Sequence, residues 1–231
     1  MRRAPAELHT SSMSEVDRLE QGDLWFVATP RVRPRNVLPL RPDDPPHPRE
    51  VQRLYLILRA HGRPVHRRLL VGRNKLPETP RQRFWACIER VGDAYDVTDD
   101  LGRIEYDTET RGPRVRPAAR TLAEGSYELA RHGKHTHLAY RLEEARAPAE
   151  VLRALRIAPK QNYIVAAFNP EAPIRLGAPH RDKAILPQWV QEKFGERRFA
   201  PLDVDLFDAA GLELVLIGGR EEAETASLAA P

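Results

Sequence analysis

Three histidines surround a predicted turn in the middle of the chain, and their types and spacing could support chemistry. His132 precedes Gly133-Lys134, and His135 and His137 follow it. Strand-length runs flank the two central residues, and glycine at the first central position suits a two-residue type II′ turn. Residues 126–142 are therefore predicted to form an antiparallel hairpin in which His132 lies opposite His135.

The predicted hairpin has one apolar and one polar face, because paired residues in an antiparallel ladder share a face of the sheet. The apolar face carries Tyr127, Leu129, Leu138, Tyr140 and Leu142. The polar face carries Glu128, His132, His135, His137 and Arg141. We expect the apolar face to pack into the core.

Imidazoles gathered on one sheet face could bind zinc or another divalent transition metal. His135-x-His137 points two ligands in the same direction, and the cross-strand His132 supplies a third. Glu128 could be a fourth ligand or the general base of a metal-dependent hydrolase. Histidines on a solvated hairpin face that bind nothing are the more common case, so this enzyme is the alternative hypothesis.

Basic residues give the leading hypothesis, which is a non-enzymatic binding or interaction protein for an anionic ligand or protein partner, with no cofactor. The residues expected to contact it are Arg111, Arg114, Arg116, Arg131 and Lys134. Residues 111–122 contain no acid, and Arg-Pro segments in extended backbone can bind phosphates. Nucleic acid is one such partner, although no recognised nucleic-acid-binding motif is present.

A short identity links two of the basic segments. The pentapeptide Pro-Arg-Val-Arg-Pro occurs at residues 30–34 and again at 113–117. In extended backbone the two arginines of each copy lie on the same side, because side chains alternate with a period of two. Nothing around the copies matches, so the sequence favours coincidence over duplication.

Composition sets the class and compartment. The chain has 231 residues, 41% of them hydrophobic and 30% charged, which is enough apolar material for a core. Its single cysteine, Cys87, excludes an intramolecular disulfide and fits a reducing compartment. No run approaches the roughly 20 apolar residues that a membrane span needs, and no secretion signal is visible. We expect a cytoplasmic protein with no membrane partner.

The charge is uneven along the chain. Its formal value is +4, but residues 30–73 hold eleven arginines against three acids, whereas residues 203–224 hold seven acids against one arginine. Of the 37 basic residues 32 are arginine. Genome base composition can produce such a bias as readily as phosphate binding can, so the total charge alone decides little.

The elements that must position these residues are mostly strands. Apolar runs predict strands at 24–28, 51–58, 67–72, 83–91, 162–168 and 212–217, besides the hairpin at 126–142, and short helices at 149–157 and after Pro187. The fold class is α+β, with a mainly antiparallel twisted sheet that could curl into a partial barrel and two or three short helices. One domain is expected over residues 22–219, between disordered tails at 1–21 and 220–231. Met13 is an alternative initiator to Met1.

Several short segments together resemble an uncharacterised family of bacterial proteins of this length. They are Gly22–Phe26, Val51–Arg53, Arg83–Trp85, Thr110–Gly112 and His135–Tyr140. The resemblance implies a single bacterial domain. It supplies no substrate, cofactor or catalytic residue.

Overall fold

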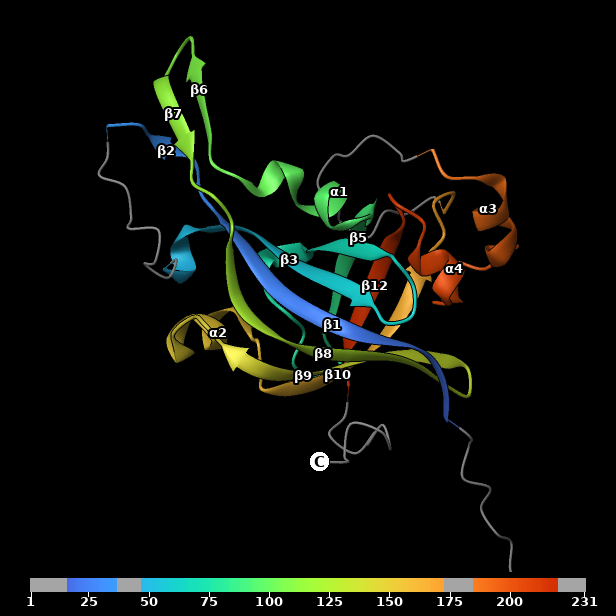
Figure 1. Cartoon of the computed structure of the whole chain (residues 1–231). Helices are drawn as coiled ribbons and strands as arrows, with labels where there is room; N and C mark the ends of the chain where they lie inside the picture. Colours follow the sequence, from blue (N-terminus) through green and yellow to red (C-terminus); the bar gives the residue numbers. More distant parts are fainter. Residues whose placement is uncertain (1–15, 37–46, 173–184, 220–231) are drawn as a thin grey trace, which may run out of the picture.

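Eight antiparallel strands close into a barrel. The computed structural model describes residues 16–36, 47–172 and 185–219. Neighbouring strands follow the order β10-β12-β5-β4-β3-β1-β8-β9, and β9 pairs with β10 to complete the ring (Figure 1). A further short strand, β11, extends the sheet beside the second half of β10. Closure leaves few unpaired strand edges in the sheet.

The strands of the main sheet are β1 (Val16–Pro30), β3 (Val51–Ala60), β4 (His66–Val71), β5 (Arg83–Gly92), β8 (Arg120–His132), β9 (His135–Ala145), β10 (Lys160–Phe168), β11 (Phe199–Pro201) and β12 (Glu213–Gly218). A second sheet contains β2 (Arg33–Pro34), β7 (Gly112–Arg116) and β6 (Ile104–Thr108), in that order. The helices are α1 (Ala94–Thr98), α2 (Ala149–Leu155), α3 (Gln188–Phe194) and α4 (Val204–Phe207), with 3-10 turns η1 (Pro48–Glu50), η2 (Gly72–Asn74) and η3 (Asp99–Leu101).

The central part of strand β3, residues 54–58, is apolar without interruption because both of its faces are buried. Leu54, Leu56 and Leu58 belong to the large core inside the barrel. Tyr55 and Ile57 point to the opposite face and form a second cluster on the outer wall. Because side chains alternate across a strand, burial of both faces requires a continuous apolar run.

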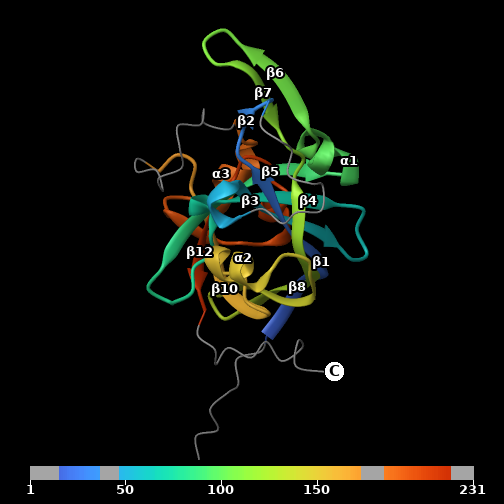
Figure 2. The same cartoon turned by 90° about the vertical axis from the view of Figure 1, so that its left-hand side faces the viewer.

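Helices cover both ends of the barrel. Helix α2 lies at one end, and α3 and α4 lie at the other (Figures 1 and 2). Val151 and Leu155 of α2 join the same core cluster as Phe194 of α3 and Phe207 of α4. The core inside the barrel is therefore continuous with the apolar side chains of the helices at both ends.

The second sheet projects from the barrel as an arm. We use "arm" for β2, β6, β7 and the turn that joins β6 to β7; it extends beyond the barrel wall with α1 near its base (Figures 1 and 2). Helix α1 and turn η3 cover the outer wall, where Val97 is fully buried against the second cluster. The backbone N–H of Ala119 donates to the carbonyl of Leu101 at 2.8 Å and closes the base of the arm.

Most predicted elements are confirmed, with several corrections. The sheet closes completely, so "partial barrel" understates it, and the described residues contain four short α-helices instead of two or three. Helices α1 and α4 and strands β2, β6, β7 and β11 were not predicted. Strand β1 begins at Val16, so the tail boundary expected at residue 22 is six residues too late. Residues 1–15 and 220–231 of the predicted tails lie outside the described residues.

Among the helices that the structure describes, none is long and apolar enough to cross a membrane.

Candidate anion-binding surface

The predicted histidine hairpin forms in the expected register. His132 pairs with His135, Ala130 with His137, and Glu128 with Ala139. Gly133 has a φ of 58°, whereas Lys134 is not among the non-glycine residues with positive φ. A positive φ at the first central residue alone is the pattern of a type II′ turn, which confirms the predicted turn type.

The structure does not arrange the three imidazoles as a metal-binding group. The described residues contain no group of three or more His, Cys, Asp or Glu side chains placed to hold a metal ion. The rings of His132 and His137 lie 6.0 Å apart between centroids. His137 is buried, and its Nδ1 lies 3.2 Å from Oδ1 of Asn162 on β10. Burial lowers the pKa of His137 and the charges of His132 and His135 lower it further, although the contact with Asn162 opposes the shift.

Glu128, the predicted fourth ligand or general base, lies beside an arginine. Glu128 is buried, and its Oε2 lies 3.5 Å from Nε of Arg18 on β1. A carboxylate held beside a guanidinium is a structural ion pair rather than a base aimed at a substrate. This contact gives no support to the hydrolase alternative.

The structure divides the predicted anion-binding residues into two groups. Arg111, Arg114 and Arg116 belong to the arm, whereas Arg131 and Lys134 lie at the far end of β8 and in the hairpin turn after it. From Arg120 to Arg131, β8 extends about 36 Å at roughly 3.3 Å per residue. A single small ligand therefore cannot contact both groups. Arg131 also donates to the carbonyl of Leu202 at 3.4 Å.

The arm brings the two Pro-Arg-Val-Arg-Pro copies side by side. Arg33 pairs with Val115 and Pro34 with Arg114, and the N–H of Arg35 donates to the carbonyl of Pro113 at 3.1 Å. The copies are antiparallel and offset by one residue. Arg33 of the first copy therefore faces the side opposite to Arg114 of the second.

One face of the arm carries arginines without acids. Cross-strand pairing places Tyr106 beside Arg114 and Ile104 beside Arg116, and we call this surface the arginine face. Among the described residues no carboxylate lies within ion-pair distance of Arg114 or Arg116. The other face holds Glu105, whose Oε2 lies 3.0 Å from Nε of Arg35.

A groove separates the arginine face from the barrel wall. Its volume is about 170 Å³. The lining residues are Thr29, Val32, Gln52, Arg53, Ile104, Tyr106 and Arg116. Two of them are arginines, one from each side, and none is acidic. The side chain of Arg53 is 48% exposed, so it can reach a ligand in the groove.

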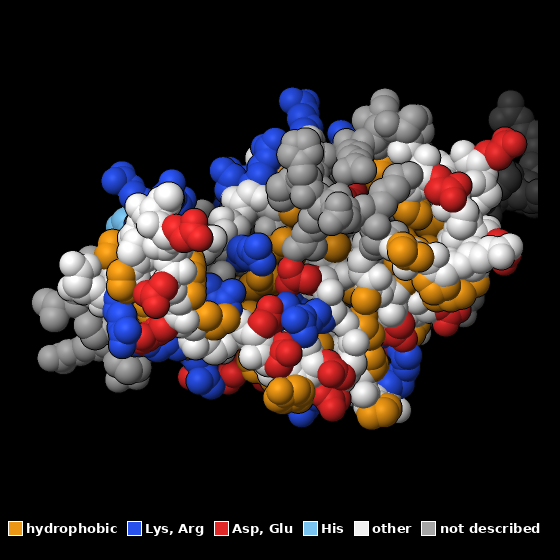
Figure 3. Space-filling view, turned by 90° about the horizontal axis from the view of Figure 1, so that it is seen from above, with side chains coloured by type: hydrophobic (Ala, Val, Ile, Leu, Met, Phe, Trp, Pro, Cys, Tyr) orange, Lys and Arg blue, Asp and Glu red, His pale blue; other side chains and the backbone are white. Residues whose placement is uncertain are grey.

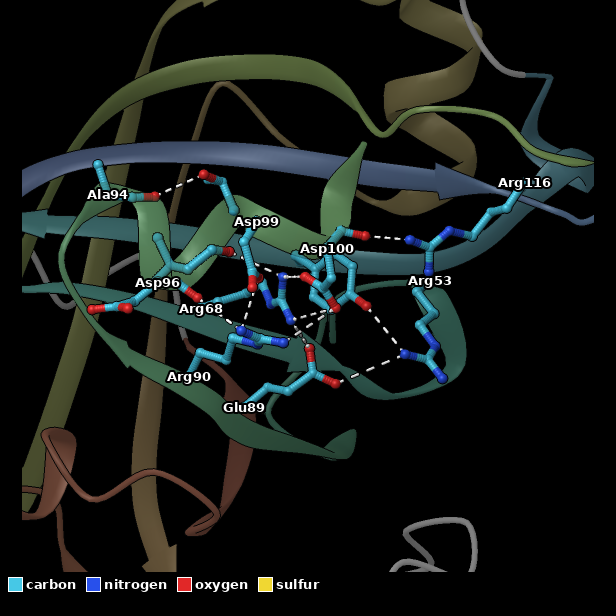
Figure 4. Close-up of polar contacts among 12 residues, drawn as sticks. Arg53, Arg68, Glu89, Arg90, Ala94, Asp96, Asp99, Asp100 and Arg116 are labelled. Atoms are coloured by element: carbon cyan, nitrogen blue, oxygen red, sulfur yellow. Dashed lines mark hydrogen bonds and ion pairs between the residues drawn. The ribbon is translucent and has the colours of Figure 1, made fainter. Parts of the chain in front are cut away.

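A polar network holds both groove arginines (Figure 4). Arg116 donates to the backbone carbonyl of Asp100. The Asp100 side chain accepts a hydrogen bond from Arg68, with 2.5 Å between Nη1 and Oδ1. Arg68 is 1% exposed and also lies 3.0 Å from Glu89. The same Glu89 lies 3.8 Å from Arg53. Arg68 thus ties the arm, the η3 turn and the barrel wall together.

Asp100 is strongly held in its charged form. Hydrogen bonding from Arg68 lowers the pKa of Asp100, and the charges of Arg68 and Arg90 add to this effect against the opposing effect of burial. Arg90 contributes a second anchor to the same turn, with its Nη1 2.8 Å from Asp99. These contacts tie the η3 turn at the base of the arm to the barrel wall.

Three residues that line the groove were not predicted from the sequence. Arg53 was assigned only to a core strand, and Ile104 and Tyr106 were left in an unassigned region. The alternation of apolar Ile104 and Tyr106 with acidic Glu105 and Asp107 is a strand signal that could have found β6. No local signal reveals that Arg53 faces Arg116.

Comparison of the chain with protein-family models, with curated proteins and with solved structures found no match.

Proposed function

We propose that this protein is a non-enzymatic binding protein whose arginine face takes a phosphate-bearing anionic ligand. The observation that carries the proposal is that Arg114 and Arg116 lie on the same face of the arm, a face without acids, and that Arg53 lies opposite across the groove. Arginine suits this task because its planar guanidinium can donate two parallel hydrogen bonds to a phosphate. Figure 3 shows Lys and Arg side chains around the arm at the left of the view, with Asp and Glu side chains among them.

The remaining predicted anion-binding residues fall into the same two groups, one on the arm and one at the hairpin. Arg111 is exposed in the turn between β6 and β7, so we place it at the outer rim of the same surface. Arg131 and Lys134 lie outside the proposed surface. They give a matched control, because replacing both removes the same charge from the protein at a distant position.

Titration with inorganic polyphosphate over a series of salt concentrations tests the proposal. We expect the logarithm of the association constant to fall steeply with the logarithm of the salt concentration, because binding releases counterions. Arg114→Ala/Arg116→Ala should weaken binding and reduce the slope by about two, roughly one per lost phosphate contact. Arg131→Ala/Lys134→Ala should leave both within experimental error.

Two outcomes would overturn the proposal: the absence of salt-dependent binding, or equal losses in the two double variants. Arg116 also holds Asp100, so thermal unfolding must show that the arm variant is folded. Arg114→Ala alone provides a second check, because no described side chain depends on Arg114 for an ion pair.

A further inference from the structure

We infer that the groove between the arm and the barrel takes one nucleotide of a single-stranded nucleic acid, with its base on Tyr106 and its phosphate between Arg53 and Arg116. This inference rests on the proposed function and names its ligand class. The juxtaposition of an exposed aromatic ring with arginines from two separate elements carries it.

The charge of the groove fits a phosphate. Arg53 and Arg116 approach from opposite sides, and the groove lining contains no carboxylate. Glu89 is the nearest described carboxylate to Arg53, and it is shared with the buried Arg68. Arg53, Arg68 and Arg116 share two carboxylates, Glu89 and Asp100. One positive charge in excess is therefore left for a ligand.

The apolar side of the groove fits a base. Tyr106 is 43% exposed and Ile104 is 41% exposed, although both are large hydrophobic side chains. Neighbouring arginines on the arm keep this surface from being purely apolar. Bases of single strands stack on aromatic rings and on guanidinium planes, and this interaction tolerates any base sequence.

The spacing along the arm fits a chain rather than an isolated phosphate. Arg114 and Arg116 are two residues apart, which is about 7 Å along a strand, and Tyr106 pairs with Arg114. The two guanidiniums can therefore contact different phosphate groups on either side of a stacked base. Inorganic polyphosphate would satisfy the arginines but would leave Tyr106 unused.

The size of the groove selects single strands. A space of about 170 Å³ between the arm and the barrel wall admits one ring system and its phosphate. A duplex keeps its base faces stacked inside the helix, so it cannot offer one to Tyr106 without unpairing. Duplex contacts would be limited to the outer edge of the arm.

The test compares four ligands with the full-length protein: a short labelled single-stranded DNA, the RNA of the same sequence, the corresponding DNA duplex, and inorganic polyphosphate. Fluorescence anisotropy gives the affinity of each labelled oligonucleotide, and competition gives that of polyphosphate. We expect at least one single strand to bind more tightly than the duplex. The comparison of DNA with RNA shows whether the 2′-hydroxyl contributes.

Variants at Tyr106 separate stacking from charge. Tyr106→Ala should weaken single-strand binding by about 5- to 150-fold, as expected for the loss of one stacked base. Tyr106→Phe should retain it, because the ring remains. Tyr95→Ala is the matched control, since Tyr95 is 73% exposed on α1 and lies outside the groove lining.

The outcomes distinguish this inference from the proposed function. If polyphosphate binds through Arg114 and Arg116 but Tyr106→Ala has no effect on oligonucleotide affinity, the nucleotide inference is wrong and the proposed function stands. Duplex binding equal to single-strand binding would also overturn the inference. If neither polyphosphate nor any oligonucleotide binds, both fail.

Discussion

Replacing Arg67 should destabilise the fold more than any surface arginine. Its side chain is 0% exposed in β4, with Nη1 2.6 Å from Oε1 of Glu20 and Nη2 2.6 Å from Oδ1 of Asp208. Its guanidinium also lies 4.6 Å from the ring of Phe207. Burial alone would lower the pKa of Arg67, but hydrogen bonding and charge from Glu20 hold it above its ordinary value. The guanidinium is thus charged and fully paired.

The expected cost of Arg67→Met follows from the partners left behind. Removing one member of a buried ion pair costs about 3–5 kcal/mol, because the other charge stays buried without compensation. Glu20 would keep the hydroxyl of Tyr127 at 2.6 Å and Arg63 at 3.1 Å. We therefore expect the lower limit, about 3 kcal/mol, which corresponds to a fall in Tm of roughly 6–12 °C for a chain of this size.

Urea unfolding of Arg67→Met and Arg63→Met measures the difference. Arg63 contacts the same two carboxylates, but its side chain is 42% exposed, so its loss should cost less than about 1 kcal/mol. Adding Glu20→Gln to Arg67→Met should recover part of the loss, because the uncompensated charge is removed. Equal costs for the two arginine variants would refute the reasoning that burial decides the value of this pair.

Two further predictions concern the β8–β9 hairpin. Gly133→Ala should lower the free energy of unfolding by about 1–2 kcal/mol, because φ is 58° at this position. Gly102→Ala should be nearly neutral, because φ is −65° there and the space around an added Cβ is equally open. Chemical denaturation of both variants checks this, and equal effects would contradict it. Because the folded pKa of His137 lies below its ordinary value of 6.5, its contribution to stability is complete above that pH and is lost as the pH falls through the folded pKa. His137→Gln should therefore flatten the acid side of the stability–pH curve relative to the unmodified protein, and a superimposable curve would show that His137 does not titrate as proposed.

The sequence determined the local structure of most strands. Burial on both faces made residues 54–58 continuously apolar, and the glycine at 133 determined the turn, the register and the faces of the hairpin. These signals are local, because side-chain periodicity and backbone conformation act over a few residues. They were sufficient to predict strand positions and which hairpin residues enter the core.

Helix α1 and strands β6 and β7 escaped prediction for a physical reason. They are short, and all the residues of β6 except Thr108 are exposed, so the alternation of Ile104 and Tyr106 with acids is only a brief signal with no buried face behind it. Their positions depend on distant contacts. The buried Arg68 on β4 forms an ion pair with Asp100 at the base of the arm. No pattern in the sequence around either residue predicts that pair.

Only the tertiary structure decided which charged residues meet. The sequence hypothesis placed Arg114, Arg131 and Lys134 in one anion-binding set, because all lie within a short span of chain. The extended strand β8 instead separates the arm from the hairpin, while the one-residue offset in the arm sets the arginines of the two pentapeptides on opposite faces. Barrel closure and strand register are properties of long-range pairing, and they brought Arg53 opposite Arg116 from more than sixty positions away along the chain.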